Sequence, residues 1–421
     1  MKRIVLTLLA ATLLLTGASA QETERVDRMK LMSADSLTRD SLYTFWNTYV
    51  QLHPKDEVAW RNLFDVSEEN VMQLGWKSWG AAKRLRRKLN VVGRMKEAIP
   101  GTYTFYLCAF EGYYTSEEKL RKMEEFNGGE FHYIRKEEYA DSAIATLPDN
   151  VSAYDYEGWI QYLIHKCDSV RLNYLLTRYY ESGQYPQEDL QYHFNELQGM
   201  DESGVYIGAH EGDVIGKLIL QQVLGVHRDK ILYDENAAHN QNYVKHVFAQ
   251  IGIPYSEDVL DRLHTMWQSK TLIAFMQYIV EHSKRPVYLS AHSMSSLILG
   301  EGLPDELKAC FYNEGLTMRY STKPYDNMSV KRRNIENRYR MEYLRMPFHP
   351  ENKIDMRRFS NSAKRYASNY MHLLHDQLPY YKKHDKERYQ WLRDIYTDII
   401  AQMRKKNVDV GEINHYLEYL K

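Results

Sequence analysis

The stretch that decides the fold is Val205–Asp213, VYIGAHEGD, in which a short apolar run ends in a glycine and a group of polar residues. Short runs that are rich in β-branched and aromatic side chains are typical of buried strands. Lys230–Tyr233 and Pro286–Ser290 repeat this pattern. Helical patterns follow along the chain, over Val214–Leu224 and around Tyr243–Ile251. Strands that alternate with helices predict a small parallel α/β sheet with flanking helices.

Helical patterns occupy the chain on both sides of these predicted strands. From Leu37 to about Gln198, apolar residues recur at three- and four-residue steps, and Pro-Asp turns interrupt them at residues 53–56 and 147–150. Helix, turn and helix in this order resemble degenerate tetratricopeptide-type repeats. An irregular helical bundle fits equally well, because no regular period of about 34 residues links the two turns.

These patterns predict an α/β fold that is mainly helical overall. A fourth strand is predicted near Ala309–Tyr312, and the chain is helical again from about Met328. The expected divisions are a signal peptide over residues 1–20, a helical, repeat-like domain over 21–200, the α/β domain over 201–327 and a C-terminal helical region over 328–421.

The N-terminus predicts export. Lys2 and Arg3 precede an apolar run from Ile4 to Leu15, and the small residues Ala18-Ser19-Ala20 follow it. This is the arrangement of a secretory signal peptide, and the run is shorter than the roughly 20 residues that a membrane-spanning helix needs. We therefore expect a mature, extracytoplasmic chain that is periplasmic or surface-associated and has no membrane span.

Charge and cysteine content exclude several classes of protein. The 55 Lys and Arg residues nearly balance 56 Asp and Glu residues, so the chain has no overall attraction to nucleic acid. The basic runs at 83–88 and 331–333 fit solvated helix faces. Three scattered cysteines are too few for a disulfide framework. A bond between Cys108 and Cys167 is one alternative, and we favour the other, unpaired thiols without a metal role.

Polar residues cluster just past the predicted strand ends. In open α/β sheets the ligand lies beyond the carboxyl ends of the strands, so these residues should converge there. They could share a proton between an acid and a base, or hold a divalent cation. The catalytic candidates are His210, Glu211, Asp213, Asp234 and His292, and the metal candidates are Glu211, Asp213, Asp234 and His239. The competing interpretation is that such residues only form turns and cap helices, because no tightly spaced metal motif is present.

Two familiar site types do not fit these residues. Ser293 is not in a G-x-S-x-G turn, which argues against a serine hydrolase. The turn at residues 208–212 lacks both G-x-G-x-x-G and the Lys-Ser/Thr of a phosphate-binding loop. No cofactor is therefore predicted.

Four pieces of sequence between residues 203 and 320 carry a resemblance. They are Glu211-Gly212-Asp213, Gln221–Asp229 (QQVLGVHRD), Arg285–Leu289 (RPVYL) and Glu314-Gly315-Leu316. In this order they resemble the extracytoplasmic C-terminal part of a bacterial family of multi-spanning membrane proteins of unknown function, related to protein O-mannosyltransferases. That family has D-N-D-T where this chain has Glu211-Gly212-Asp213-Val214, so an amide and a hydroxyl are missing here. The family's membrane half is absent, and its glycosyl-transfer chemistry is not carried over.

The resemblance implies an exported accessory protein of glycan or envelope assembly in Gram-negative bacteria. The expected function is therefore a binding or scaffold protein of the bacterial envelope, with envelope proteins or glycans as partners. The alternative is an envelope hydrolase or transferase that uses the strand-end carboxylates and histidines.

Aromatic residues and Asp-Ser pairs give two further expectations. Trp46, Trp60, Trp159 and Tyr162 should be core residues and not a sugar-stacking platform, because they recur with other apolar residues at helical spacing. Asp-Ser followed by an aliphatic residue is a pattern that one group of Gram-negative bacteria uses for O-glycosylation, and it is also typical of helix N-termini. The pattern occurs at Ser36, Ser41, Ser142 and Ser169. If any of these serines carries glycan, we expect it to be Ser36 or Ser41, and we expect Ser169 to lie inside a packed helical hairpin.

Overall fold

The structure is a computed structural model, and it describes the greater part of the chain. The described residues are 25–26, 36–67, 79–112, 136–208, 211–238, 240–259, 268–291, 293–294, 305–340, 369–370, 373–405, 414 and 417. They belong to two compact units, Met1–Val151 and Ser152–Lys421, and each unit is described by itself. The predicted signal peptide lies outside the described residues. Within them, no helix combines the length and the apolar character that crossing a membrane requires.

The first unit is helical. Its helices are α3 (Ser36–Leu52), α4 (Glu57–Val66), α5 (Trp79–Ala98), α6 (Tyr103–Gly112) and α8 (Lys136–Ala145). The predicted Pro-Asp turn joins α3 to α4, where the Asp56 carboxylate accepts a hydrogen bond from the Ala59 N–H at 2.9 Å and so caps α4. Trp60 is buried in the core of this unit beside Leu63 and Phe64.

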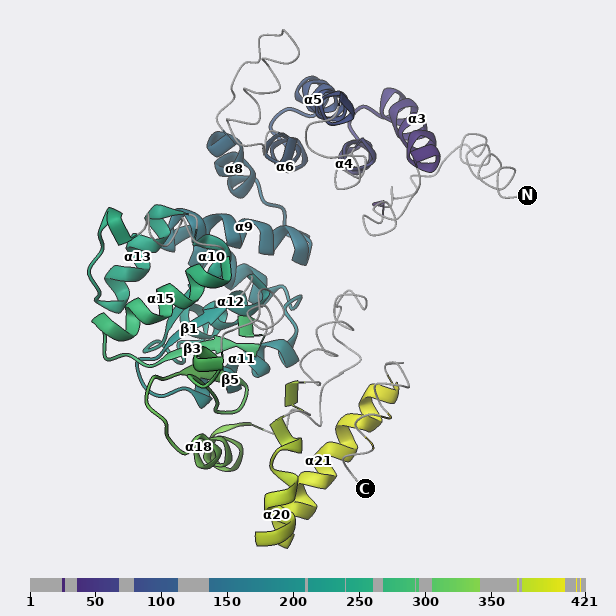
Figure 1. The fold of residues 1–421 in the computed structure, drawn as a ribbon. Coiled ribbons are helices and arrows are strands. Elements are labelled where there is room, and N and C mark those ends of the chain that lie inside the picture. Colours follow the sequence, from purple (N-terminus) through teal and green to yellow (C-terminus); the bar gives the residue numbers. More distant parts are fainter. Residues whose placement is uncertain are drawn as a thin grey trace. The chain divides into compact units, whose positions relative to one another are not determined.

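The second unit contains the sheet. Its helices before and between the parallel strands are α9 (Ala153–Lys166), α10 (Ser169–Glu181), α11 (Gln187–Gly199), α12 (Glu211–Leu218), α13 (Gln241–Ile251) and α15 (Gln268–His282). The strands are β1 (Val205–Gly208), β2 (Ile231–Asp234), β3 (Val287–Ser290), β4 (Phe311–Asn313) and β5 (Thr317–Tyr320). Among the described residues they form one five-stranded sheet in the order β2-β1-β3-β5-β4. Figure 1 labels the three inner strands β1, β3 and β5.

The predicted α/β class is confirmed, with one addition. β1, β2 and β3 are parallel, as expected, whereas β5 runs antiparallel to both β3 and β4. The sheet is therefore mixed. The sequence TMRY of β5 gives only four residues and little apolar alternation, so sequence reasoning did not identify this strand.

Helices cover the two faces of the sheet with different chemistry. On one face the aromatic rings of Tyr233 and Phe275 lie 4.3 Å apart, so β2 contacts α15 through an apolar layer. On the other face Tyr206 meets polar side chains of α11 and α12. Successive side chains of a strand point to opposite faces of the sheet, so the side chains of Tyr206 and its neighbour Ile207 lie on different faces. The polar face is the one that carries the candidate site.

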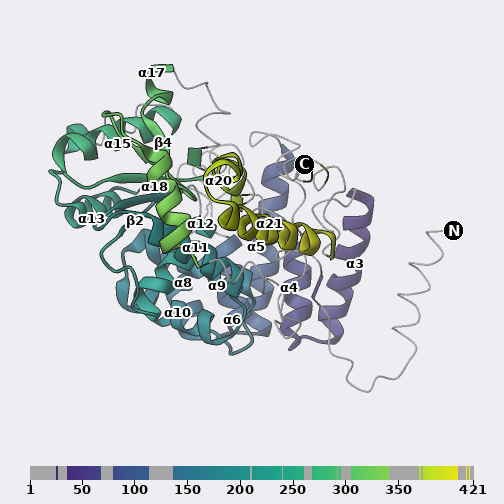
Figure 2. The same cartoon turned by 90° about the horizontal axis from the view of Figure 1, so that it is seen from below.

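The C-terminal helices pack beside the sheet. They are α18 (Asn327–Arg333), the π-helical turn η4 (Asn334–Arg338), α20 (Leu378–His384) and α21 (Lys386–Lys405), and α17 (Asp305–Lys308) precedes β4. α18 lies beside the edge strand β4 (Figure 2). Tyr339, Tyr381 and Leu392 share one core with Tyr192 of α11 and Leu316 of the β4–β5 turn. The helices α9–α11, which we assigned to the N-terminal domain from sequence, belong to the compact unit that holds the sheet.

Most of the aromatic and cysteine expectations agree with the structure. Trp60 and Trp159 are buried, as predicted, and Trp46 and Tyr162 are partly buried. The three cysteines are free thiols, and burial raises the pKa of Cys108 to about 12.

One expectation is wrong. Ser169 is exposed at the first position of α10, because the packed face of that helix begins only at Leu172. Ser41 is exposed as expected, and the side chain of Ser36 lies outside the described part of the chain.

Candidate functional site

The strand order places a topological switch point at the carboxyl ends of β1 and β3. β1 lies between β2 and β3, so the chain leaves β1 to one side for β2 and later returns to the other side for β3. The carboxyl ends of two such strands are the topological switch point where open α/β sheets bind ligands. The residues that follow these ends are therefore the first candidates.

Asp213 and Ser290 join the two sides of this switch point. The Ser290 hydroxyl donates a hydrogen bond to Asp213 Oδ2 at 3.0 Å, and it accepts one from the Ser293 N–H at 2.9 Å. Asp213 reaches this position because α12 lies close against β1. A Cβ atom on Gly208 would stand only 2.9 Å from the Asp213 Cβ, so a glycine is required there. The side chains of Asp213 and Ser290 are both buried, and the hydrogen bond between them holds them in place.

Asp234 and Glu235 add two carboxylates at the end of β2. Asp234 pairs with Gly208 in the parallel register, which brings the ends of β1 and β2 together. The Asp234 carboxylate is buried and accepts a hydrogen bond from the Asn236 N–H at 2.9 Å. Glu235 is partly exposed, and burial raises its pKa to about 7, with further increases from the negative charges of Asp234 and Asp213. The three carboxylates therefore interact at one edge of the sheet.

The structure describes some of the predicted site residues. Asp213 and Asp234 lie at the same edge, as the strand-end argument expected. His210, His239 and His292 lie outside the described residues, and so does the side chain of Glu211, although its backbone begins α12. Among the described side chains, no group of three or more acidic, His or Cys residues is arranged to hold a metal ion. The metal prediction for Glu211, Asp213, Asp234 and His239 stays a prediction.

A buried ionic layer, formed by Lys217 and Glu196 with Tyr206, contacts the backbone of Asp213. Lys217 Nζ lies 2.5 Å from Glu196 Oε2 and donates a hydrogen bond to the Asp213 carbonyl oxygen at 2.7 Å. The Tyr206 hydroxyl donates to the other Glu196 oxygen at 3.0 Å. Both charged side chains are almost completely buried, at 0% and 2% exposure. Burial raises the pKa of Glu196 to about 7, although Lys217 opposes this increase.

Sequence reasoning missed this layer. One signal was available, because VIGKLIL at residues 214–220 places a single lysine in an otherwise apolar helix. A lysine is rarely buried without a partner. Its partner Glu196 is 21 residues away on α11, which only the tertiary structure brings into contact.

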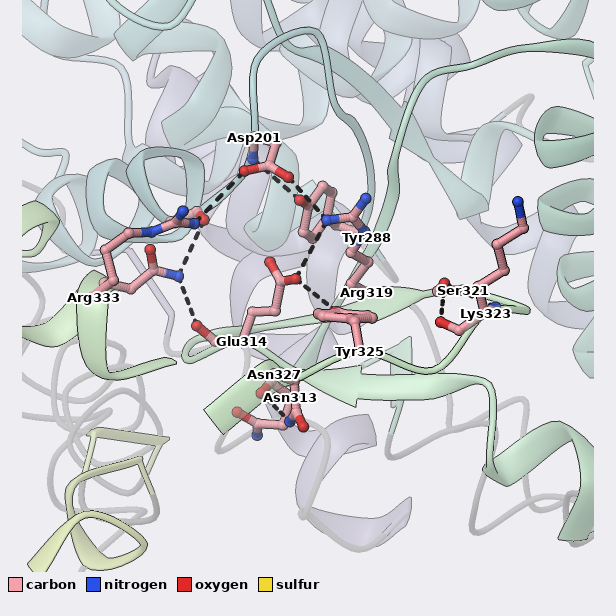
Figure 3. Close-up of polar contacts among 12 residues, drawn as sticks. Asp201, Tyr288, Asn313, Glu314, Arg319, Ser321, Lys323, Tyr325, Asn327 and Arg333 are labelled. Atoms are coloured by element: carbon pink, nitrogen blue, oxygen red, sulfur yellow. Dashed lines mark hydrogen bonds and ion pairs between the residues drawn. The ribbon is translucent and has the colours of Figure 1, made fainter. Parts of the chain in front are cut away.

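Another buried acid, Glu314, lies farther along the sheet (Figure 3). Glu314 follows β4 and is completely buried. Its Oε1 atom accepts a hydrogen bond from the Tyr325 hydroxyl at 2.6 Å and lies 3.5 Å from Arg319 Nη1. Arg319 also forms an ion pair with Asp201 at 2.9 Å. The sequence alone predicts no site role for Glu314.

The Gln221–Asp229 segment contains a loop that its own side chains close. The Gln221 side-chain amide donates to the carbonyl oxygens of His227 and Lys230 at 2.8 and 2.9 Å. Arg228 Nε donates to the Gln221 carbonyl oxygen at 3.0 Å. Asp229 accepts from the Ser203 N–H at 3.0 Å. These contacts close the loop that enters β2, at the amino edge of the sheet and therefore opposite to the carboxylates.

No protein-family model, curated protein or solved structure matches the chain.

Proposed function

We propose that this chain is an exported binding protein of the bacterial envelope, and that its α/β unit binds a hydroxyl- or amino-bearing ligand at the strand-end carboxylates. One observation carries the proposal, the convergence of Asp213, Asp234 and Glu235 at the switch-point edge. Carboxylates accept hydrogen bonds, so they select ligands that are rich in donors. Glycans and amino sugars of the envelope have this character, and the predicted signal peptide and the resemblance favour the same compartment.

The rigidity of the site favours binding over proton transfer by the two buried acids. The Asp213 carboxylate accepts a hydrogen bond from the Ser290 hydroxyl, and the Asp213 backbone carbonyl accepts one from Lys217. Asp234 is fixed by the backbone of Asn236. Side chains that packing and hydrogen bonds hold in place are the usual basis of a preorganised binding site.

Removal of one carboxylate tests the binding proposal. Glu235→Gln keeps the shape of the side chain and removes its charge. A hydrogen bond to a charged group contributes about 1.5–3 kcal/mol, so we expect the affinity for an envelope glycan fraction to fall by about tenfold or more. Glu306→Gln is the matched control, because Glu306 is exposed on α17. Equal affinities of wild type and Glu235→Gln in isothermal titration calorimetry would contradict the proposal.

An envelope hydrolase or transferase is the second candidate, and the pKa of Glu235 favours it. A partly exposed carboxyl group with a pKa of about 7 can exchange its proton at neutral pH, as a general acid or base must. The measurement is release of reducing ends from envelope glycans as a function of pH. Turnover that Glu235→Gln abolishes would establish the enzyme, whereas binding without turnover supports the binding protein.

The compartment has its own test. Fractionation of the native host should recover the chain outside the cytoplasm. Its mass should be that of a chain that begins at residue 21. Recovery of the full-length chain in the cytoplasm would contradict the proposed location in the envelope.

A further inference from the structure

The polar edge of the sheet continues beyond the strand-end carboxylates. Asp234 pairs with Gly208, and Ser290 pairs with Thr317 across β3 and β5. The Glu314 N–H then donates to the Thr317 carbonyl oxygen at 3.1 Å, in the turn between β4 and β5. All five positions are buried. The row therefore ends at the buried acid Glu314, on the antiparallel side of the sheet.

Three polar atoms around Glu314 have no hydrogen-bond partner among the described residues. They are Glu314 Oε2, Thr317 Oγ1 and Asn334 Oδ1. These residues are linked, because the Asn334 amide donates to the Glu314 carbonyl oxygen at 2.7 Å. Each is 0–1% exposed. Buried polar atoms are normally satisfied by protein groups or by water, so three such atoms on linked residues are candidates for hydrogen bonds to a bound molecule.

The chemistry of these atoms restricts the molecule. A carboxylate oxygen and an amide oxygen can only accept hydrogen bonds, and a threonine hydroxyl can donate or accept. The bound molecule must therefore present at least two donors. A hydroxyl-rich molecule and an ammonium group both meet this requirement.

The surrounding charges favour an uncharged molecule. Arg319 lies 2.9 Å from Asp201 and 3.5 Å from Glu314, and Arg333 lies 3.7 Å from Asp201 (Figure 3). Among these four described side chains two guanidinium groups balance two carboxylates, so they leave no net negative charge to attract a cation. The Tyr325 hydroxyl donates to Glu314, and the Tyr325 ring lies 4.6 Å from the ring of Tyr312, so aromatic side chains of the type on which sugar rings pack lie next to this position.

We propose that Glu314, Thr317 and Asn334 form a binding position for the hydroxyl groups of an uncharged sugar or polyol. This position is distinct from the strand-end carboxylates, and it does not depend on the function proposed for them. Its signature is that Thr317 should matter for binding and not for stability, since its hydroxyl makes no hydrogen bond within the described fold.

The test uses Thr317→Val in the full chain purified from its host. Valine has the shape of threonine without the hydroxyl. The probes are methyl glycosides of glucose, galactose, mannose and N-acetylglucosamine at millimolar concentration, observed by saturation-transfer-difference NMR. We expect at least one glycoside to bind wild type, at least tenfold weaker binding to Thr317→Val, and an equal or higher melting temperature of this variant. Thr322→Val, on the exposed loop after β5, should bind like wild type.

Several results would overturn the proposal. The first is that no glycoside binds wild type, and the second is that glycosides bind Thr317→Val as tightly as wild type. The third is a lower melting temperature of Thr317→Val, which would show that the hydroxyl supports the fold. Binding of methylammonium without any glycoside would contradict the uncharged class. Binding lost in Glu235→Gln and kept in Thr317→Val would place the glycoside at the strand-end carboxylates instead.

Discussion

The buried pair of Lys217 and Glu196 is the residue-scale feature with the largest expected effect on stability. Lys217→Met would leave Glu196 buried without its cation, and breaking such a pair destabilises a protein by roughly 3–5 kcal/mol. Replacing both charges, as in Lys217→Met with Glu196→Gln, should recover part of this loss. Urea denaturation of the two variants measures the difference. If Lys217→Met alone is as stable as wild type, Glu196 is not buried from water as the structure shows.

Trp60 tests the core of the first unit. It is buried beside Leu63 and Phe64, and its indole N–H donates to the Pro54 carbonyl oxygen at 2.9 Å. Trp60→Ala should reduce the free energy of unfolding by roughly 3–5 kcal/mol. Val58→Ala on the same helix is the control and should have a small effect, since Val58 is 36% exposed. Equal melting temperatures of Trp60→Ala and wild type would return this tryptophan to consideration as a glycan contact.

Glu235 predicts a pH dependence of stability. Its pKa is raised from 4.5 to about 7 in the fold, so between these pH values the folded chain binds more protons than the unfolded chain. Its contribution to stability is complete below pH 4.5 and is lost as the pH rises through 7. Glu235→Gln should therefore gain melting temperature relative to wild type between pH 5 and pH 8. Parallel curves for the two proteins would show that the pKa of Glu235 is ordinary.

At the scale of elements, the cap of α13 offers a defined test. The Asn240 side-chain oxygen accepts hydrogen bonds from the N–H groups of Asn242 and Tyr243, at 3.0 and 3.2 Å. Asn240→Ala should destabilise the second unit by about 1 kcal/mol, within a range of roughly 0.5–2 kcal/mol. Asn242→Ala removes an exposed side chain of the same type and should change little. Thermal unfolding compares the two variants, and equal losses would contradict the capping role.

Some elements were predictable from sequence and others were not, for physical reasons. The turn at residues 53–56 was predictable because Pro and Asp provide local turn and capping signals. β1, β2 and β3 were predictable because each is a buried apolar run that ends in polar residues. β5 was missed because Thr317 and Arg319 interrupt its apolar pattern, and Arg319 instead lies 3.5 Å from the carboxylate of Glu314. The exposure of Ser169 was missed because apolar spacing alone does not show where a packed face begins.

At the scale of the whole molecule, the sequence predicted which edge of the sheet carries the acidic groups, and not how they are supported. The rule for α/β sheets brought Asp213 and Asp234 together without any coordinates. The contacts that hold them connect positions far apart in the chain, such as Ser290 with Asp213 and Lys217 with Glu196. No local pattern encodes those pairs, so the supporting layer became visible only in the fold.

The central claim is that the polar edge of the sheet is the binding surface of this protein. Hydrogen–deuterium exchange of the full chain, with and without a glycan fraction from the host envelope, tests this most directly. We predict slower exchange in the segments at residues 205–218, 231–237, 287–294 and 311–320, and little change elsewhere. Unchanged exchange in these segments together with slower exchange confined to residues 36–112 would contradict the claim and place the binding surface on the helical unit.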